Sequence, residues 1–179
     1  MNPAPNLVLI GPMGAGKTSI GKQLAARLGL QFVDADQRLE QIAGATVPMI
    51  FEHEGEAGFR LREARLIAEL MQGRNQLVAT GGGAVLSADN RQQLHRHGFV
   101  VYLKASVAQQ IQRLAHDSSR PLLASGDKLE KLTALAIARN PLYEQTADLA
   151  FDSDHLTVAD AADRVCAGIQ AQWQREDVA

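Results

Sequence analysis

Cysteine is nearly absent from this sequence of 179 residues. The single thiol, Cys166, has no second cysteine with which to form an internal disulfide, and this favours a reducing compartment. The sequence also lacks a large excess of positive or negative charge. The formal net charge is -2, so no overall basic field argues for a nucleic-acid partner.

Long apolar runs are missing too. No run approaches the roughly 20 residues that a membrane helix needs, so we expect no membrane partner. The first residues, MNPAPNLVLIGP, have no basic segment before their short apolar run and do not resemble a signal peptide. Together with the lone thiol, these features predict a cytoplasmic protein.

The remaining composition is ordinary, with 46% hydrophobic and 21% charged residues, and the length suits one domain over residues 1–179. Strand-like runs alternate with helix-like runs, which predicts an α/β fold of three α/β/α layers around a mainly parallel five-stranded sheet. The expected strands are residues 6–10, 31–34, 76–83, 99–103 and 148–152. The expected helices are one that ends at Gly29, a region of about 37–72 broken at Gly44 and within HEGEAG, and helices at about 88–96, 106–116, 127–139 and 157–174.

A glycine-rich segment, GPMGAGKT, lies between the first expected strand and the first helix. Its spacing, Gly11-x4-Gly16-Lys17-Thr18, is the complete Walker A pattern. Glycines let consecutive N–H groups point at a polyphosphate, and the helix N-terminus adds partial positive charge. Lys17 would reach the β- and γ-phosphates, and the Thr18 hydroxyl would ligate Mg²⁺. The expected phosphate-binding residues are Gly14, Ala15, Gly16, Lys17, Thr18 and Ser19.

Two carboxylates, Asp34 and Asp36, follow the second expected strand in the segment FVDAD. Alternate residues of an extended segment point to the same side, so both would face one cleft. One can hold Mg²⁺ through water, and the other can orient or deprotonate an acceptor hydroxyl. The plainer alternative is an Asp-rich turn that caps the next helix.

Seven separated motifs together resemble those of the shikimate kinase family and cover nearly the whole chain: GPMGAGKTSIG, FVDAD, GEAGFRLRE, ATGGGAV, VVYL, RPLL and RNPLY. Members of this family transfer the γ-phosphate of ATP to the 3-hydroxyl of shikimate, a step toward chorismate and the aromatic amino acids. The resemblance implies a P-loop kinase fold, ATP and shikimate as substrates, Mg²⁺ as cofactor and a monomeric protein.

The same resemblance implies roles for single residues. Asp36 would bind the acceptor hydroxyls as base or orienter, and Asp34 would be an outer-shell Mg²⁺ residue beside Thr18. Arg60 and Arg139 would grip the carboxylate of shikimate. The other implied residues are three glycines at the substrate ring, a lid arginine that approaches the phosphates and an arginine near adenine: Gly81, Gly82, Gly83, Arg120 and Arg113. The expected catalytic set is Lys17, Asp36 and Arg120.

The chemistry of these side chains agrees with those roles, because a planar guanidinium binds a carboxylate through two parallel hydrogen bonds. A substrate-binding region is expected at about 34–72. A lid is expected at about 115–127, where the sequence fits neither the helical nor the strand period. Arg120 on such a loop would arrive on closure and exclude water. Glu63, one helical turn after Arg60, either holds that arginine or forms a plain surface pair.

Two other functions stay open. One is another small-molecule P-loop kinase, for gluconate or for a nucleoside monophosphate. The other is a regulatory module that binds ATP without transferring phosphate, although such a module has no need of the acceptor residues. We expect Arg62 and Arg65 to be surface or ion-pair residues, Cys166 to be a packed thiol, and all five histidines to be structural or solvated: His53, His95, His97, His116 and His155.

Overall fold

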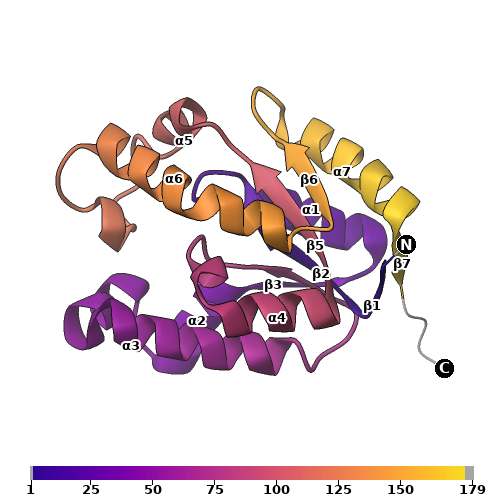
Figure 1. Ribbon diagram of the computed structural model, residues 1–179, viewed down its shortest axis with the longest axis horizontal. Coiled ribbons are helices and arrows are strands. Elements are labelled where there is room, and N and C mark those ends of the chain that lie inside the picture. The colour runs from indigo at the N-terminus through magenta and orange to yellow at the C-terminus, as the bar shows by residue number, and fades with distance from the viewer. Residues whose placement is uncertain (1, 176–179) are drawn as a thin grey trace.

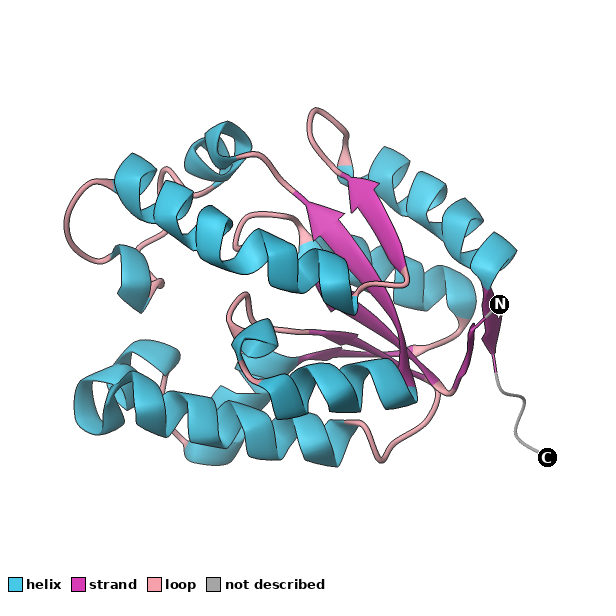
Figure 2. Ribbon diagram, viewed as in Figure 1, coloured by secondary structure: helices cyan, strands magenta, loops and turns pink. Residues whose placement is uncertain are grey.

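The computed structural model describes residues 2–175 and places a parallel sheet between two layers of helices (Figure 1, Figure 2). Every neighbouring pair of strands in this sheet is parallel. The order across the sheet is β3 (Gln31–Asp34), β4 (Gln76–Ala79), β2 (Asn6–Ile10), β5 (Gly98–Lys104) and β6 (Leu149–Asp152). The α/β class and the five-stranded sheet predicted from the sequence are therefore confirmed.

The central strand β2 and its neighbour β5 are buried on both faces. All five residues of β2 are buried, which accounts for its unbroken apolar character. Successive side chains of a strand point to opposite faces, so Leu7 packs into one core and Val8 into the other. The sheet thus separates two hydrophobic cores.

Helices cover both faces of the sheet. α1 (Lys17–Leu28) and α7 (Val158–Gln172) pack into the first core. As predicted, α1 ends at Gly29, whose φ of 63° is the left-handed conformation that favours glycine. The helices that contribute to the second core are α2 (Ala35–Ala43), α3 (Val47–Leu70), α4 (Ala88–His97) and α6 (Lys128–Thr146).

The long helical region breaks where the sequence predicted. α2 ends at Gly44, and α3 begins after Thr46, whose hydroxyl accepts the N–H of Met49. The second break lies inside HEGEAG, where Gly55 leaves the helical conformation with a φ of 71°. α2 begins two residues earlier than expected, because the carboxylate of Asp34 caps its first turn.

The helix predicted at 127–139 is longer, since α6 continues through Pro141 to Thr146. Proline removes one helical hydrogen bond and usually ends or kinks a helix. Here the turns beyond Pro141 place Tyr143 and Thr146 in buried positions, and this packing offsets the lost bond.

Two other elements, a strand and a helix, are shorter than predicted. The strand expected at 76–83 ends at Ala79, because the three glycines turn the chain into the short helix η1 (Ala84–Leu86). The helix expected at 106–116 is α5 (Val107–Arg113), which stops where the next residue enters a small apolar cluster.

A second sheet joins the chain ends and was not predicted. It pairs β1 (Asn2–Ala4) with β7 (Trp173–Arg175) in parallel. The indole N–H of Trp173 donates to the carbonyl of Ala4 at 3.0 Å, and its ring packs beside Phe99. α7 was predicted to reach residue 174 but ends at Gln172, because Trp173 continues as a strand.

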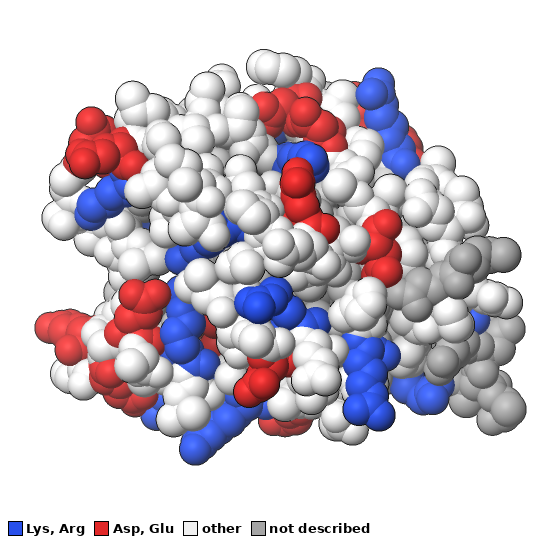
Figure 3. All heavy atoms as spheres, viewed as in Figure 1, with Lys and Arg blue, Asp and Glu red and all other residues white. Residues whose placement is uncertain are grey.

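Charged side chains of both signs are scattered over the face seen in Figure 3, without a large patch of either sign. Within residues 2–175, none of the helices is both long enough and apolar enough to cross a membrane.

Candidate active site

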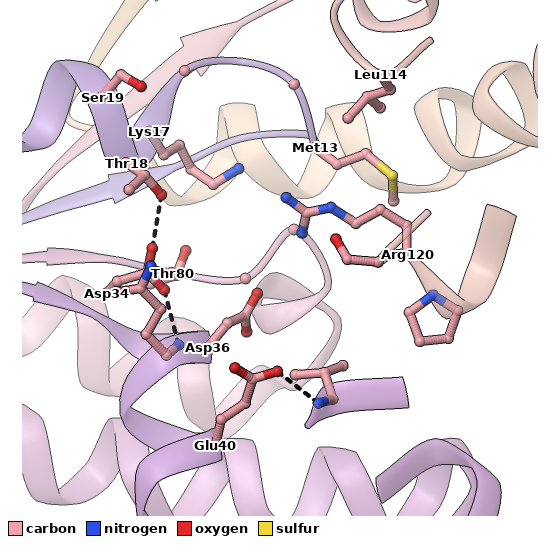
Figure 4. Close-up of a pocket in the computed structure, with 18 residues that line it drawn as sticks. Met13, Lys17, Thr18, Ser19, Asp34, Asp36, Glu40, Thr80, Leu114 and Arg120 are labelled. Atoms are coloured by element: carbon pink, nitrogen blue, oxygen red, sulfur yellow. Dashed lines mark hydrogen bonds between the residues drawn. The ribbon is translucent and has the colours of Figure 1, made fainter. Parts of the chain in front are cut away.

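A cavity of about 410 Å³ lies at the carboxyl edge of the sheet (Figure 4). Its lining comes from the loop after β2, the end of β3, the start of α2 and the segment around Arg120. A smaller hollow of about 60 Å³ shares part of this lining, including Asp36 and Arg120. We call the two hollows the larger lobe and the smaller lobe.

The Walker A loop, residues 11–16, borders the larger lobe, and its glycines adopt conformations that other residues rarely adopt. Gly11, Gly14 and Gly16 have φ values of 144°, 79° and 90°. A Cβ on Gly11 would also lie 2.3 Å from the Leu103 carbonyl oxygen, so this glycine lets the loop approach β5. Gly16 starts α1 without a side-chain cap, which leaves the helix N-terminus for an anion.

Lys17 is the buried cation of the larger lobe, with 9% of its surface exposed. Its ammonium group donates to the carbonyls of Gly11 and Pro12, each at 2.8 Å. Burial and, after it, the positive charge of Arg120 lower the pKa of Lys17 to about 8, whereas the charge of Asp36 opposes the shift. An anion bound here would favour the charged form of the lysine.

Thr18 and Asp34 lie side by side at the start of α1 and the end of β3. The Thr18 hydroxyl donates to Oδ2 of Asp34 at 2.7 Å, while Oδ1 accepts the Gln37 N–H. Asp34 therefore caps α2 and also faces the cavity. The two alternatives for this carboxylate, a helix cap and a group that faces the cleft, are compatible. Hydroxyl and carboxylate oxygens beside a phosphate loop fit Mg²⁺, which prefers oxygen ligands and retains several waters. In residues 2–175, no three His, Cys, Asp or Glu side chains form a ready metal cluster.

Asp36 lies in the first turn of α2 and lines both lobes. Burial raises the pKa of Asp36, and the neighbouring Asp34 raises it further. The positive charges of Arg120, Lys17 and Arg60 act in the opposite direction. A carboxylate in this balance can accept a hydrogen bond from a hydroxyl held between the lobes.

Arg60 lines the smaller lobe and is held by Glu63. The pair Nη1–Oε2 is 2.8 Å long, and Glu63 is only 3% exposed, so the first alternative for Glu63 is the one observed. Burial raises the pKa of the Glu63 carboxyl, and the charge of Arg60 opposes this shift. Two buried atoms here, Nε of Arg60 and Oε1 of Glu63, have no hydrogen-bond partner within the described residues.

Arg139 reaches the same lobe from α6 and is 5% exposed. One turn later, the Tyr143 hydroxyl donates to the Gly82 carbonyl at 2.5 Å and fixes the glycine loop against α6. Burial raises the pKa of Tyr143 to about 12. The sequence analysis did not assign Tyr143, although it belongs to the motif RNPLY.

None of the three glycines has a positive φ, and two of them, Gly81 and Gly83, are required for space, whereas a Cβ on Gly82 would make only ordinary contacts of 3.5–3.6 Å. A Cβ on Gly83 would lie 2.2–2.4 Å from guanidinium atoms of Arg60. A Cβ on Gly81 would lie 2.8 Å from Oδ1 of Asp36 and 3.0 Å from Oε1 of Glu63. The loop therefore packs directly against the polar groups of the cleft.

The segment expected as a lid, 115–127, contains the short helix η2 (Pro121–Leu123). Arg120 precedes η2 and points toward Lys17 across the cavity (Figure 4). Its Nε donates to Oδ2 of Asp117 at 3.3 Å, which leaves the terminal nitrogens toward the larger lobe.

The structure brings most of the predicted residues together. Those that line the larger lobe are Gly14, Gly16, Lys17, Thr18, Ser19, Asp34, Asp36, Gly81, Gly82 and Arg120, and the smaller lobe adds Arg60, Gly83 and Arg139. Ala15 is fully buried, and Arg113 lines neither lobe. Arg113 instead donates to the carbonyls of Gly14 and Ser153, a residue that the sequence analysis missed.

Residues set aside at the sequence level also lie outside the cleft. None of the five histidines lines either lobe. Arg62 forms an ion pair with Glu54 at 2.7 Å, as expected. Cys166 is a free, half-buried thiol beside the first core.

Known proteins resemble this chain in sequence and in fold. The family model described as shikimate kinase matches residues 13–170. A shikimate kinase of Stenotrophomonas maltophilia strain R551-3 is 56% identical over 99% of each chain, and one of Xanthomonas campestris pv. campestris strain 8004 is 51% identical over 97% of each. The solved shikimate kinase from Acinetobacter baumannii in complex with shikimate has a TM-score of 0.92 at 42% identity over 95% of each chain. A gluconokinase from Sinorhizobium meliloti 1021, at 17% identity and a TM-score of 0.57, shares the fold alone.

Proposed function

From the premise that the chain belongs to the shikimate kinase family, and is thus an ATP-dependent kinase that phosphorylates shikimate, we propose how the two lobes divide the reaction. The larger lobe holds the triphosphate of ATP, and the smaller lobe holds shikimate with its 3-hydroxyl toward the γ-phosphate. One observation carries this proposal: a phosphate loop and a pair of arginines open onto adjoining hollows that share Asp36 and Arg120.

ATP binds along residues 14–19, where the N–H groups of the loop and the N-terminus of α1 face its phosphates. Lys17 leaves the loop carbonyls and pairs with the β- and γ-phosphates. Thr18 and, through water, Asp34 are the residues that would hold Mg²⁺, and the bound ion would supply positive charge that stabilises the phosphates during transfer.

Shikimate binds through its carboxylate, which Arg60 and Arg139 hold with paired hydrogen bonds. Glu63 keeps Arg60 in position, and the glycine loop 81–83 lies against the ring. Asp36 accepts a hydrogen bond from the acceptor hydroxyl and orients it in line with the γ-phosphate. Asp36 takes the hydroxyl proton as the new O–P bond forms, while the bond between the γ-phosphorus and the bridging oxygen breaks and ADP leaves.

Arg120 completes the site from the lid, residues 115–127, by neutralising charge on the transferred phosphoryl group. Closure of this segment also excludes water, which limits hydrolysis of ATP. Residues 34–72 form the embedded substrate-binding region of the single kinase domain. A monomer is part of the proposal because one chain lines both lobes, and a cytoplasmic location is part of it because the lone thiol suits a reducing compartment.

The proposal is tested with an ADP-release assay on shikimate, gluconate and a nucleoside monophosphate. We expect turnover with shikimate alone. Arg60→Ala and Arg139→Ala should each weaken shikimate binding by about 2–5 kcal/mol, because a charged hydrogen-bond partner is lost. ADP binding should change little, and Arg62→Ala, whose ion pair lies outside both lobes, should leave both affinities unchanged.

A comparable loss of ADP affinity in the Arg60 and Arg139 variants would contradict the assignment of the smaller lobe. Turnover with gluconate and none with shikimate would show that gluconate, and not shikimate, is the acceptor substrate. ATP binding without any acceptor-dependent turnover would instead indicate a regulatory module.

A further inference from the structure

The backbone carbonyls of the phosphate loop are almost all engaged. Five of the six in residues 11–16 accept a hydrogen bond. Lys17 donates to two of them, and the N–H of Ile20 donates to a third, that of Gly16. The other two, those of Gly14 and Ala15, are held by side chains from outside the loop and its helix.

These two outside donors are Arg113 and Ser153. Nη1 of Arg113 lies 2.8 Å from the carbonyl oxygen of Gly14, and the Ser153 hydroxyl lies 3.1 Å from that of Ala15. The donors are joined to each other, because Nη2 of Arg113 donates to the Ser153 carbonyl at 3.0 Å. Ser153 is only 1% exposed, so water cannot readily replace its hydroxyl.

The anchorage of Ser153 connects this arrangement to the sheet. Its hydroxyl also lies 2.9 Å from the carbonyl oxygen of Lys104, the last residue of β5, so its single proton is shared between the Lys104 and Ala15 carbonyls. The Ser153 N–H donates to the same Lys104 oxygen at 3.2 Å. Ser153 follows β6, so two neighbouring strand ends fix the position from which the loop is held.

We propose that Arg113 and Ser153 are positioning residues that brace the phosphate loop in its binding conformation. In a planar trans peptide the carbonyl and the following N–H point in opposite directions. A bond to the Gly14 carbonyl therefore sets the direction of the Ala15 N–H, which donates to the Pro12 carbonyl at 3.2 Å within the loop. A bond to the Ala15 carbonyl sets the direction of the Gly16 N–H, and a phosphate loop directs N–H groups of this kind at its anion.

This inference rests on the proposed role of the loop in holding the phosphates of ATP. It also gives Arg113 a task other than the adenine contact that the family resemblance implies. A residue that only touches the base would leave the ligand-free loop unchanged, whereas a brace acts before any ligand arrives.

The first test is amide hydrogen exchange of the ligand-free protein over residues 12–18. In Ser153→Ala and in Arg113→Ala we expect faster exchange there than in the wild type, and unchanged exchange over the glycine loop 81–83. The KM for ATP should rise roughly tenfold, the effect of losing one such hydrogen bond, while the KM for shikimate stays within about twofold. Arg113 is exposed, so its variant should fold even where that of buried Ser153 does not.

Two controls separate positioning from general stability. Thr146→Val removes another buried hydroxyl, which donates to the Leu142 carbonyl at 2.6 Å on α6, and it should leave loop exchange and the KM for ATP unchanged. Ser153→Thr keeps a hydroxyl at this position and should restore much of the ATP affinity.

For Arg113, kcat/KM is compared between ATP and GTP. Loss of a brace lowers both by the same factor, whereas loss of an adenine contact lowers the value for ATP alone. Unchanged amide exchange over residues 12–18 in both variants would contradict the positioning role of Arg113 and Ser153, and this result does not depend on the identity of the acceptor substrate. Absence of wild-type turnover with shikimate instead overturns the proposed function and leaves the exchange result standing.

Discussion

Burial shifts the pKa values of two side chains in the cleft in the direction that favours their neutral forms. The pKa of Lys17 falls to about 8, and that of Asp36 rises above its usual range. Each charge has lost water and has only part of its compensation within the protein. A bound anion would stabilise the charged form of Lys17, and a hydrogen-bond donor or a cation would stabilise the charged form of Asp36.

The lowered pKa of Lys17 predicts an alkaline limit for ATP capture. Below about pH 8 the free enzyme carries a charged Lys17, and above it the neutral amine cannot pair with phosphate. We expect kcat/KM for ATP to fall as the pH rises through about 8. In Lys17→Arg this limit should disappear whatever the remaining rate, because a guanidinium stays charged throughout. A wild-type profile that stays flat until the ordinary lysine range, near about pH 10, would contradict the prediction.

A second prediction concerns space beside Arg60. Gly83→Ala adds a methyl group where guanidinium atoms of Arg60 already lie, at 2.2–2.4 Å from the new carbon. Displacement of Arg60 should raise the KM for shikimate by about tenfold or more, since overpacking typically costs about 1–3 kcal/mol. The KM for ATP should change little. Gly168→Ala in α7, where the new carbon meets only the end of Leu149 at 3.2 Å, is the matched control. Unaltered shikimate kinetics in the Gly83 variant would show that Arg60 is not needed where it lies.

At the scale of elements, the lid is fixed at one side by a small apolar cluster. Leu123 of η2, 6% exposed, packs there with Leu114 and Leu132. Met13 of the phosphate loop packs against the same cluster. The segment that carries Arg120 is therefore joined to the loop through side-chain packing.

Leu123→Ala should weaken this attachment by about 2–5 kcal/mol locally. We expect faster proteolytic cleavage within residues 115–127 and a lower kcat, because Arg120 then occupies less often the position in which we propose that it acts. The KM for shikimate should be nearly unaffected. Leu129→Ala removes an exposed leucine just beyond the lid and serves as control. Equal cleavage rates and equal kcat in the two variants would argue against the attachment.

Elements governed by local sequence were predictable, and those governed by distant contacts were not. β2 and β3 have their predicted bounds, because apolar runs next to turn residues define them locally. The extension of α6 through Pro141 depends on where Tyr143 is buried, and the sheet of β1 and β7 joins opposite ends of the chain. Neither contact leaves a local signal in the sequence.

The candidate site divides in the same way. The phosphate loop is one contiguous motif, so the pattern alone located it, and the family resemblance located Arg60, Arg139 and Arg120. The residues that hold these groups in position could not be predicted from the sequence. Glu63 remained one of two alternatives, and Ser153 was missed because its contacts with the loop span 138 residues of sequence.

At the scale of the whole molecule, the parallel sheet assembles the cleft. The strands end at one edge, so residues that follow β2, β3 and β4 meet there, although they are far apart in the chain. α6 and the lid then add Arg139 and Arg120. In the proposed function two anionic substrates occupy adjoining lobes, and they would repel each other without the cations between them.

This arrangement predicts that the two substrates bind cooperatively. Arg120 and Asp36 line both lobes, so a ligand in either one orders side chains that the other ligand also uses. Titration calorimetry should show that shikimate tightens ADP binding by about fivefold or more, and ADP should tighten shikimate binding by the same factor, as linkage requires. In Arg120→Ala the coupling should fall, because one of the two shared side chains is lost, whereas Arg62→Ala should keep it in full. If both ligands bind independently in the wild type, or if the coupling is the same in Arg120→Ala as in the wild type, Arg120 does not connect the two lobes.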